Sequence, residues 1–187
     1  MKLIRLNSAD STNNRLKELA KQGVEAPCVI IAAEQSAGRG SHERQFSSPA
    51  GGLYLSFLMR PGTSPEETAP VTKCAAVAVR RAMLSVCPEL DIKIKPVNDL
   101  LVSGKKLCGI LTELTGNNLV IGVGINVNRT EFPYDLNATS LQIETGTVLD
   151  LKPLESSVID ELLKLEQMWP HGCSEYFVEY TREGIEL

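Results

Sequence analysis

The sequence predicts an α+β protein with a mostly antiparallel or mixed sheet flanked by helices. Three observations support this fold class. Short apolar runs typical of strands are separated by segments with helical spacing. Several of these runs follow one another across tight turns, as in β-hairpins. No repeat, low-complexity stretch or linker divides the 187 residues, a length within the size of one domain. We therefore expect a single domain over residues 1–187.

The strands are expected where apolar residues run together or alternate with polar ones. Residues 2–6 alternate, whereas 28–35 and 53–60 are nearly continuous apolar runs typical of buried strands. Four further runs lie in the middle of the chain, at residues 92–95, 99–102, 106–114 and 119–128. Because turns such as SGK and TGNN join them, these four are expected to pair antiparallel as consecutive hairpins.

Two helices are expected in the first half of the chain. Residues 10–23 read as a helix that Ser11 or Thr12 can cap and Gly23 can end. Residues 64–86 carry a proline and two acids in their first turn, and the Ala and Val that follow predict close packing against the sheet.

The C-terminal part of the chain is expected to be helical after a polar loop at residues 129–150. Apolar side chains with helical spacing then occur at Leu154, Val158, Leu162, Leu165 and Trp169. Residues 173–187 predict a last helix with a short tail.

The composition excludes several classes of protein. A formal net charge of -4 argues against a nucleic-acid binder that works by bulk charge. No run approaches the ~20 apolar residues of a membrane span, and the N-terminus does not resemble a signal peptide. With five cysteines, two histidines and no CxxC, a zinc site is not expected. These features favour the cytoplasm, with Cys28, Cys74 and Cys108 as buried thiols.

A glycine-rich, basic loop lies between the second and third predicted strands, at residues 34–56 (EQSAGRGSHERQFSSPAGGLYLS). Its glycines allow a backbone to approach a ligand closely. Arg39 and Arg44 can fork onto carboxylate or phosphate oxygens, and Phe46 could stack on a base. A solvated hairpin loop would explain these residues equally well. The loop is not a P-loop, which requires a glycine followed by Lys and Ser or Thr.

A second candidate group is formed by Lys95, Asn98, Asp99 and Lys106, which flank two strands and a turn. Such residues are commonly solvated turn residues. However, an apolar strand containing Gly109 follows Lys106 at once, so the ammonium could lie at the mouth of a cleft.

Two shorter motifs have both a structural and a functional interpretation. The glycines of GVGIN (122–126) suggest a bulge, a bend or a wall against a ligand, but their spacing is not that of the dinucleotide fingerprint. The polar residues of DSTNN (10–14) suit a helix N-cap, and they could also hydrogen-bond a small polar ring.

In this order and spacing, the motifs resemble the catalytic domain of biotin–protein ligases, which attach biotin to a lysine of a carrier domain. The resemblance runs from about Asp10 to Asn128 and softens through the C-terminal helices. It rests on DSTN, EQSAGRG with Arg44 and Phe46, GGLYLSFLMRP, the NDL that follows Lys95, GKKLCGILTEL and GVGINVN.

The resemblance implies ATP-dependent activation of biotin to biotinyl-5'-AMP, followed by transfer to a lysine of a biotin carrier domain. Magnesium would accompany the ATP. Arg39 and Lys106 would be catalytic, since they would meet the biotin carboxylate and the α-phosphate. Biotin would be bound by Ser11, Thr12, Asn13, Gln35, Gly38, Arg39, Lys106 and Gly109. ATP would be bound by Arg39, Arg44, Phe46, Asn98 and Asn126. Relatives often pair through sheet edges, so a homodimer is a further expectation.

The chain departs from the family pattern in two motifs. The family loop GRGRxGRxW reads GRGSHERQF here, so Ser41, Glu43 and Phe46 replace an arginine, a glycine and a tryptophan. Because Glu43 brings negative charge toward the phosphates, we expect weaker retention of the adenylate. In addition, Pro96 and Val97 replace the Trp and Pro of the family's KWPND.

Neither an N-terminal helix-turn-helix nor the small C-terminal β-barrel of many relatives is expected in this chain. Two other functions stay open. A biotin or biotinyl-AMP binding protein with impaired ligation would fit the altered loop. A lipoate or octanoate ligase would share the fold, but these acids have no ureido group for Ser11 and Thr12 to bind.

Overall fold

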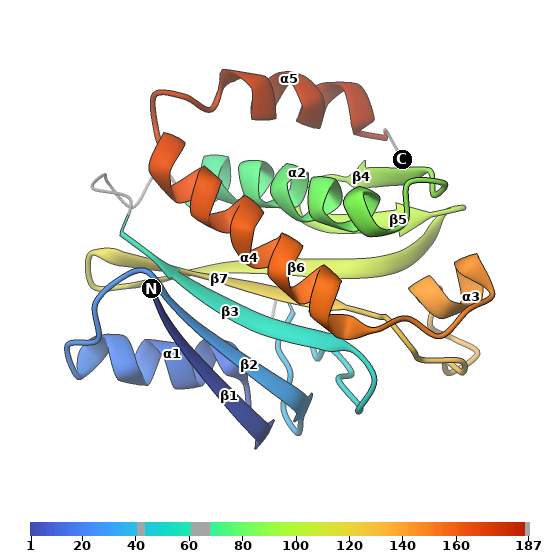
Figure 1. Cartoon of the computed structure of the whole chain (residues 1–187), viewed down its shortest axis with the longest axis horizontal. Helices are drawn as coiled ribbons and strands as arrows, with labels where there is room; N and C mark the ends of the chain where they lie inside the picture. The colour runs from blue at the N-terminus through green and yellow to red at the C-terminus, as the bar shows by residue number, and fades with distance from the viewer. Residues whose placement is uncertain (41–43, 61–67, 186–187) are drawn as a thin grey trace.

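The computed structural model describes residues 1–40, 44–60 and 68–185. A seven-stranded sheet forms its centre, in the order β1-β2-β3-β7-β6-β5-β4 (Figure 1). The strands are β1 (Lys2–Ala9), β2 (Cys28–Gln35), β3 (Leu53–Met59), β4 (Ile92–Lys95), β5 (Asp99–Val102), β6 (Lys105–Thr115) and β7 (Asn118–Ile125). The helices are α1 (Thr12–Lys21), α2 (Thr68–Val86), α3 (Leu141–Thr145), α4 (Leu151–Met168) and α5 (Ser174–Glu183). The predicted α+β class is therefore confirmed.

The sheet is mixed because one pair of neighbours is parallel. β1 pairs parallel with β2, and the other neighbours pair antiparallel. The consecutive hairpins expected between β4 and β7 are confirmed. Parallel pairing of β1 and β2 is possible because α1 provides the crossover connection between them.

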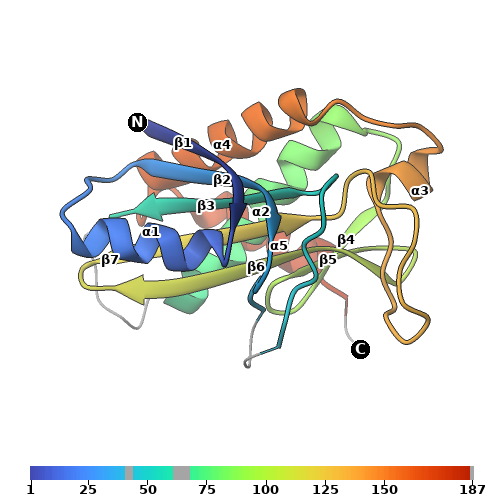
Figure 2. The ribbon, with the colours of Figure 1, turned by 90° about the horizontal axis from the view of Figure 1, so that it is seen from below.

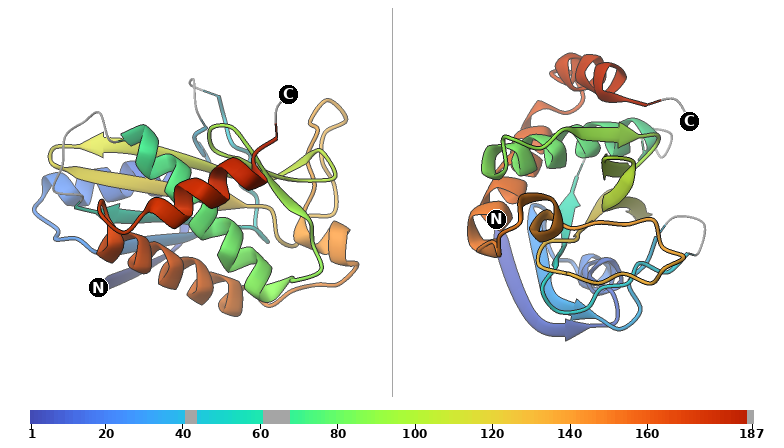
Figure 3. Two further views of the ribbon diagram at one scale, coloured as in Figure 1. Left: turned by 90° about the horizontal axis from the view of Figure 1, so that it is seen from above. Right: turned by 90° about the vertical axis from the view of Figure 1, so that its right-hand side faces the viewer.

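Helices cover both faces of the sheet in layers. α1 packs on one face against β2, β3 and β7, whereas α2 and α4 pack together on the other face (Figure 1). α5 lies outside α2 and forms an additional outer layer (Figure 3). The close packing predicted for the Ala-rich helix is confirmed, since Ala75, Ala78 and Ala82 have no solvent exposure.

The helix boundaries differ from the predicted ones at several points. Ser11 occupies the N-cap position of α1, but its side chain makes no capping hydrogen bond. α2 is described from Thr68, and residues 64–67 of the predicted helix fall outside the described part of the chain. The prediction of a continuous loop over 129–150 was wrong, because Ser140 accepts from the backbone N–H of Ile143 and starts α3.

All five cysteines are buried, free thiols, as predicted for Cys28, Cys74 and Cys108. Burial raises the pKa of each of these thiols above its ordinary value. A buried thiol with a raised pKa is a poor nucleophile, so we assign the cysteines to the packed interior.

An ion-pair network joins the last helix to the rest of the molecule. Glu179 on α5 lies 3.0 Å from Arg80 and 2.8 Å from Arg81, both on α2. Its side chain is only 12% exposed. Glu179→Ala removes the charge-assisted hydrogen bonds to both arginines, although Arg80 keeps Glu183 at 3.0 Å, so it should lower the free energy of unfolding by about 2–3 kcal/mol. Urea denaturation tests this, with the exposed Glu175→Ala on the same helix as control. Equal stability of the two variants would contradict the expectation.

The strand register gathers several loops at one end of the sheet. Gln35 ends β2, Leu53 begins β3 opposite Ile125 at the end of β7, and Ile125 in turn lies opposite Cys108 near the start of β6. Figure 2 shows the β2–β3 connection and the loop after β7 at this end, away from the β6–β7 turn. The motifs singled out in the sequence therefore converge there.

No helix in the described part of the chain is both long and apolar enough to cross a membrane.

Candidate functional site

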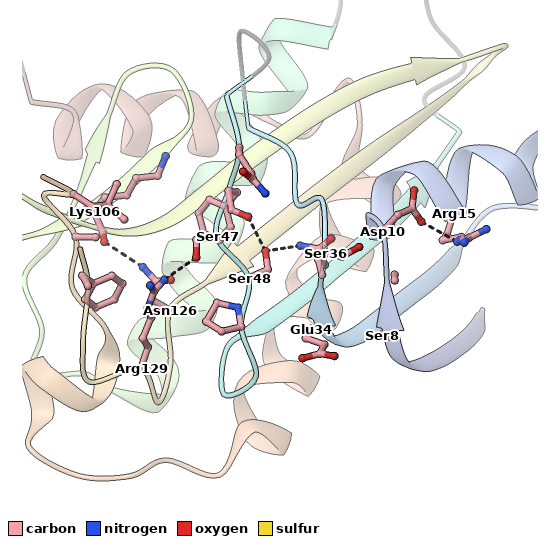
Figure 4. A pocket seen from close by; sticks show the side chains of 18 residues that line it. Ser8, Asp10, Arg15, Glu34, Ser36, Ser47, Ser48, Lys106, Asn126 and Arg129 are labelled. Carbon is pink, nitrogen blue, oxygen red and sulfur yellow. Dashed lines mark hydrogen bonds and ion pairs between the residues drawn. The ribbon is translucent and has the colours of Figure 1, made fainter. Parts of the chain in front are cut away.

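Two neighbouring cavities open at this end of the sheet. A cavity of about 380 Å³ lies beside the start of α1 and over β6 and β7. A larger cavity of about 910 Å³ lies between the ends of β1 and β2, residues 45–49 and the loop after β7 (Figure 4). Lys106 and Phe46 line both cavities, so these two side chains stand where the cavities meet.

The floor of the smaller cavity contains Gly109, Gly122 and Gly124. A Cβ built on Gly122 would overlap the side-chain amide of Asn13, and one built on Gly124 would lie 2.7 Å from the Phe46 ring. β7 pairs in regular register with both of its neighbours, so the bulge interpretation of GVGIN was wrong. The groups that lie against the glycines are protein side chains, and a ligand wall at these strands stays a prediction.

A chain of hydrogen bonds runs along the cavity wall from α1 to the β2–β3 connection. Gln35 Oε1 accepts from the backbone N–H of Thr12 at 2.8 Å, and Gln35 Nε2 donates to Ser48 Oγ at 2.8 Å. Ser56 Oγ lies 2.8 Å from Thr12 Oγ1 and donates to Asn13 Oδ1 at 2.6 Å. These bonds fix the orientation of the Gln35 and Asn13 amides. A ligand in the cavity would therefore meet polar groups with set donor and acceptor directions.

A carboxylate, Glu113 on β6, closes this wall at the α1 side. It accepts from Asn13 Nδ2 at 2.9 Å and from Lys17 Nζ at 2.8 Å, and Arg39 Nη1 lies 3.5 Å away. Burial by itself would raise the pKa of Glu113. The hydrogen bonds from Lys17 and Asn13, together with the charges of Lys17 and Arg39, outweigh burial and lower the pKa below its ordinary value of 4.5.

This lowered pKa predicts a pH-dependent contribution to stability. A carboxylate whose pKa falls on folding stabilises the protein above its unfolded-state pKa and loses that contribution as the pH falls through the folded value. Wild type should therefore exceed Glu113→Gln by about 1 kcal/mol at pH 7. The difference should shrink as the pH falls below 4.5. Urea unfolding of both proteins at pH 7 and near pH 3 measures it. A difference that does not change with pH would contradict the assignment.

Lys106 is held at the opposite side of the smaller cavity. Its ammonium pairs with Asp99 at 2.8 Å and lies 5.7 Å from the centre of the Phe46 ring. Its backbone is bonded to the loop after β7, through Asn137 O at 3.0 Å and the Thr139 N–H at 2.9 Å. The expectation that this ammonium lies at the mouth of a cleft is thus confirmed.

Two asparagines predicted to serve a nucleotide donate to backbone carbonyls. Asn98 Nδ2 donates to Ile110 O at 2.6 Å, and Asn126 Nδ2 donates to Thr139 O at 3.0 Å. Both side chains thereby hold the strands and the loop that frame the cavities.

The fold brings the predicted site residues together with few exceptions. Those that line the smaller cavity are Ser11, Thr12, Asn13, Gln35, Arg39, Arg44, Phe46, Asn98, Lys106 and Gly109. Asn126 lines the larger cavity. Gly38 lies just outside both, where a Cβ would overlap Phe46 O and Ser48 Oγ. Their roles toward a ligand remain predictions. Ser41 and Glu43, on which the expectation about adenylate retention depends, lie outside the described residues.

Several cavity and wall residues were missed by the sequence interpretation. Arg129 lies over the Phe132 ring at 4.5 Å, donates to Ser47 Oγ at 3.2 Å and lines the larger cavity (Figure 4). Its position directly after GVGINVN could have drawn attention to it. Ser56 and Glu113 each stand within a quoted motif, yet no local pattern distinguishes them from ordinary strand residues.

The described residues provide no preformed set of side-chain ligands for magnesium. In the parts of the chain that the structure describes, no cluster of three or more His, Cys, Asp or Glu side chains could hold a metal ion. Magnesium at nucleotide sites is commonly held by substrate phosphates and water with only one or two carboxylates. The site could therefore accept a magnesium ion that enters with a nucleotide.

Comparison with known proteins identifies the family. Residues 6–128 match the biotin/lipoate A/B protein ligase family. The chain belongs to this family. This biotin/lipoate ligase family member is 35% identical to the bifunctional ligase/repressor BirA of Bacillus spizizenii, in a match that covers 79% of the present chain. It is also 30% identical to the biotin--[acetyl-CoA-carboxylase] ligase of Mycobacterium tuberculosis over 95% of its length. The chain spans 48% of the Bacillus relative and 68% of the mycobacterial one.

The family member also resembles solved structures over its whole length. The biotin protein ligase from Aquifex aeolicus in complex with biotin and ATP matches with a TM-score of 0.89 and 31% sequence identity. The match covers 100% of this chain and 79% of the Aquifex chain. Similarity therefore extends through the C-terminal helices, where the sequence motifs are weak.

Proposed function

We propose that this protein activates biotin with ATP to form biotinyl-5'-AMP and transfers the biotinyl group to a lysine of a carrier domain. The observation that carries the proposal is the position of Lys106, which lines both a small polar cavity and a larger neighbouring one. A cation between two ligand cavities suits a reaction that joins two anions. The solved Aquifex relative, a complex with biotin and ATP, supports this choice of ligands.

The smaller cavity is proposed to hold biotin. Thr12, Asn13 and Gln35 have fixed polar groups on its wall, and Ser11 is 1% exposed beside them. A ureido ring needs donors and acceptors in set directions, and a preoriented site provides them without a further ordering cost. A purely aliphatic acid would place apolar surface against this polar wall and form no hydrogen bonds with it, so the wall favours a polar ring.

The larger cavity is proposed to hold ATP. Arg129 and Lys106 place positive charge at its wall, and Phe46 and Phe132 provide aromatic surface. Arginine suits phosphate oxygens, and an aromatic ring can stack on a base. Of the residues predicted to bind the nucleotide, Asn126 lines this cavity, whereas Arg39, Arg44 and Asn98 line the smaller one and would reach the nucleotide from that side.

The first step requires positioning and charge neutralisation. A biotin carboxylate oxygen attacks the α-phosphorus of ATP, the new C–O–P bond forms, and pyrophosphate leaves with the electrons of the broken P–O bond. Both reactants are negatively charged, so fixed cations at Arg39 and Lys106 would lower the barrier. No protein nucleophile is needed. Magnesium, when bound with ATP, would supply further positive charge to the phosphates.

The second step transfers the acyl group to the carrier. The neutral amine of the acceptor lysine attacks the acyl carbon, an amide bond forms, and AMP leaves while the amine loses a proton. Until then the mixed anhydride must be kept from water. The β2–β3 connection carries Arg39, Arg44 and Phe46 to the cavity, so we assign it the task of excluding water.

The decisive experiment is pyrophosphate release from ATP and magnesium with biotin, lipoate or octanoate supplied separately. Release that depends on biotin, together with label transfer to a carrier lysine, is the expected result. Release with lipoate or octanoate alone would instead favour a ligase for those acids. Biotin binding without pyrophosphate release would favour a binding protein with impaired ligation.

A cytoplasmic location and a homodimer also remain predictions.

A further inference from the structure

We propose that Glu113 and Lys17 are positioning residues for Arg39. In the empty site, Glu113 keeps the Arg39 guanidinium at the rim of the smaller cavity through an ion pair. Lys17 weakens this ion pair, so that Arg39 can exchange it for one with the carboxylate of the ligand. This inference rests on the proposed function, because it assumes that Arg39 meets the carboxylate of biotin.

The geometry shows two cations at one carboxylate oxygen. Lys17 Nζ lies 2.8 Å from Glu113 Oε1, whereas Arg39 Nη1 lies 3.5 Å from the same atom. Arg39 also donates to Asn14 Oδ1 at 3.1 Å. Because Lys17 occupies the closer position, the pull of Glu113 on Arg39 is partly cancelled. Removing the lysine charge should let the guanidinium approach the carboxylate more closely.

Glu113 keeps other partners when Arg39 leaves it. Its second oxygen accepts from Asn13 Nδ2 at 2.9 Å, and Lys17 remains on the first. The carboxylate is therefore not left unpaired, which is the condition that makes breaking a buried ion pair unfavourable. The side chain of Arg39 is 43% exposed, so its own release from Glu113 should require little free energy.

Lys17 itself does not line either cavity, whereas Arg39 lines the smaller one. We therefore expect Lys17 to act on the ligand mainly through Glu113, which it contacts directly. Lys106 is held differently. Among the ion pairs of the described residues, Asp99 has no second cation beside Lys106. The shared carboxylate is thus a feature of the Arg39 side of the cavity, and it connects a residue outside the site to ligand affinity.

Lys17→Met tests the inference through the charge of the ligand. The variant should bind biotin about threefold more weakly, because Glu113 then retains Arg39. It should bind biotinamide, which has no carboxylate, as well as wild type does. Calorimetry measures both dissociation constants without ATP. Lys21→Met, the same charge change later in α1, is the matched control and should leave both constants unchanged.

A second variant separates positioning from folding. Glu113→Gln added to Lys17→Met should restore biotin affinity, because the neutral amide no longer holds Arg39. Lys17→Arg should behave like wild type. Equal weakening of biotin and biotinamide, or no restoration in the double variant, would overturn the inference. The inference would also be overturned if Lys17→Met bound biotin as tightly as Lys21→Met does. These constants are independent of pyrophosphate release, so a protein that binds biotin but forms no adenylate would refute only the proposed reaction.

Discussion

Lys106→Ala should lower the rate of biotin-dependent pyrophosphate release by about 10²- to 10³-fold, the usual effect of removing one group that stabilises developing charge in the transition state. The ammonium lines both cavities, and in our proposal it bridges the attacking carboxylate and the α-phosphate. Asp99, its partner at 2.8 Å, would then add uncompensated negative charge at the same place. Single-turnover pyrophosphate release measures the chemical step directly.

The matched control for this variant is Lys105→Ala. Lys105 is the neighbouring residue on β6, is exposed and lines neither cavity. It should retain nearly full activity. If Lys106→Ala stayed folded and released pyrophosphate at a rate within about threefold of Lys105→Ala, Lys106 would not be catalytic.

Gly122→Ala should raise the dissociation constant for biotin by at least about tenfold and lower the free energy of unfolding by about 1–3 kcal/mol, as overpacking of an interior typically does. The added methyl group would overlap the Asn13 amide, which is 4% exposed and bonded to Ser56 and Glu113. Asn13 would have to leave that network. Calorimetry with biotin and urea unfolding measure the two effects.

Two further variants show whether the effect passes through Asn13. Gly124→Ala adds the same methyl group on the same face of β7, but against the Phe46 ring, so it should disturb the wall shared by the two cavities and leave the Asn13 network in place. Asn13→Ala combined with Gly122→Ala should recover part of the lost stability while biotin binding stays weak. Biotin affinity in Gly122→Ala equal to that of wild type would show that the Asn13 position is not needed.

The site explains why so many unlike motifs occur in one chain. DSTNN supplies the start of α1, GVGIN supplies a side-chain-free floor for Asn13 and Phe46, and the β6 motif supplies Lys106 and Glu113. Each motif has an ordinary structural interpretation when taken alone. Their common purpose becomes visible only where the ends of β2, β3, β6 and β7 meet.

The sequence by itself determined the features that depend on neighbouring residues. The hairpins from β4 to β7 follow from apolar runs joined by short turns, and α1 follows from the helical spacing of its apolar residues. The order of the motifs was likewise sufficient to identify the family, and most of the site residues predicted from it line one of the two cavities, because residue type and spacing are local properties.

Only the tertiary structure decided which distant residues touch. Lys17 and Glu113 meet across 96 positions of the chain, and nothing in their immediate surroundings predicts the pair. The parallel pairing of β1 with β2 and the place of Phe46 over Gly124 are of the same kind. Such contacts form because burying the sheet under helices fixes where each strand end lies, and that constraint belongs to the whole fold.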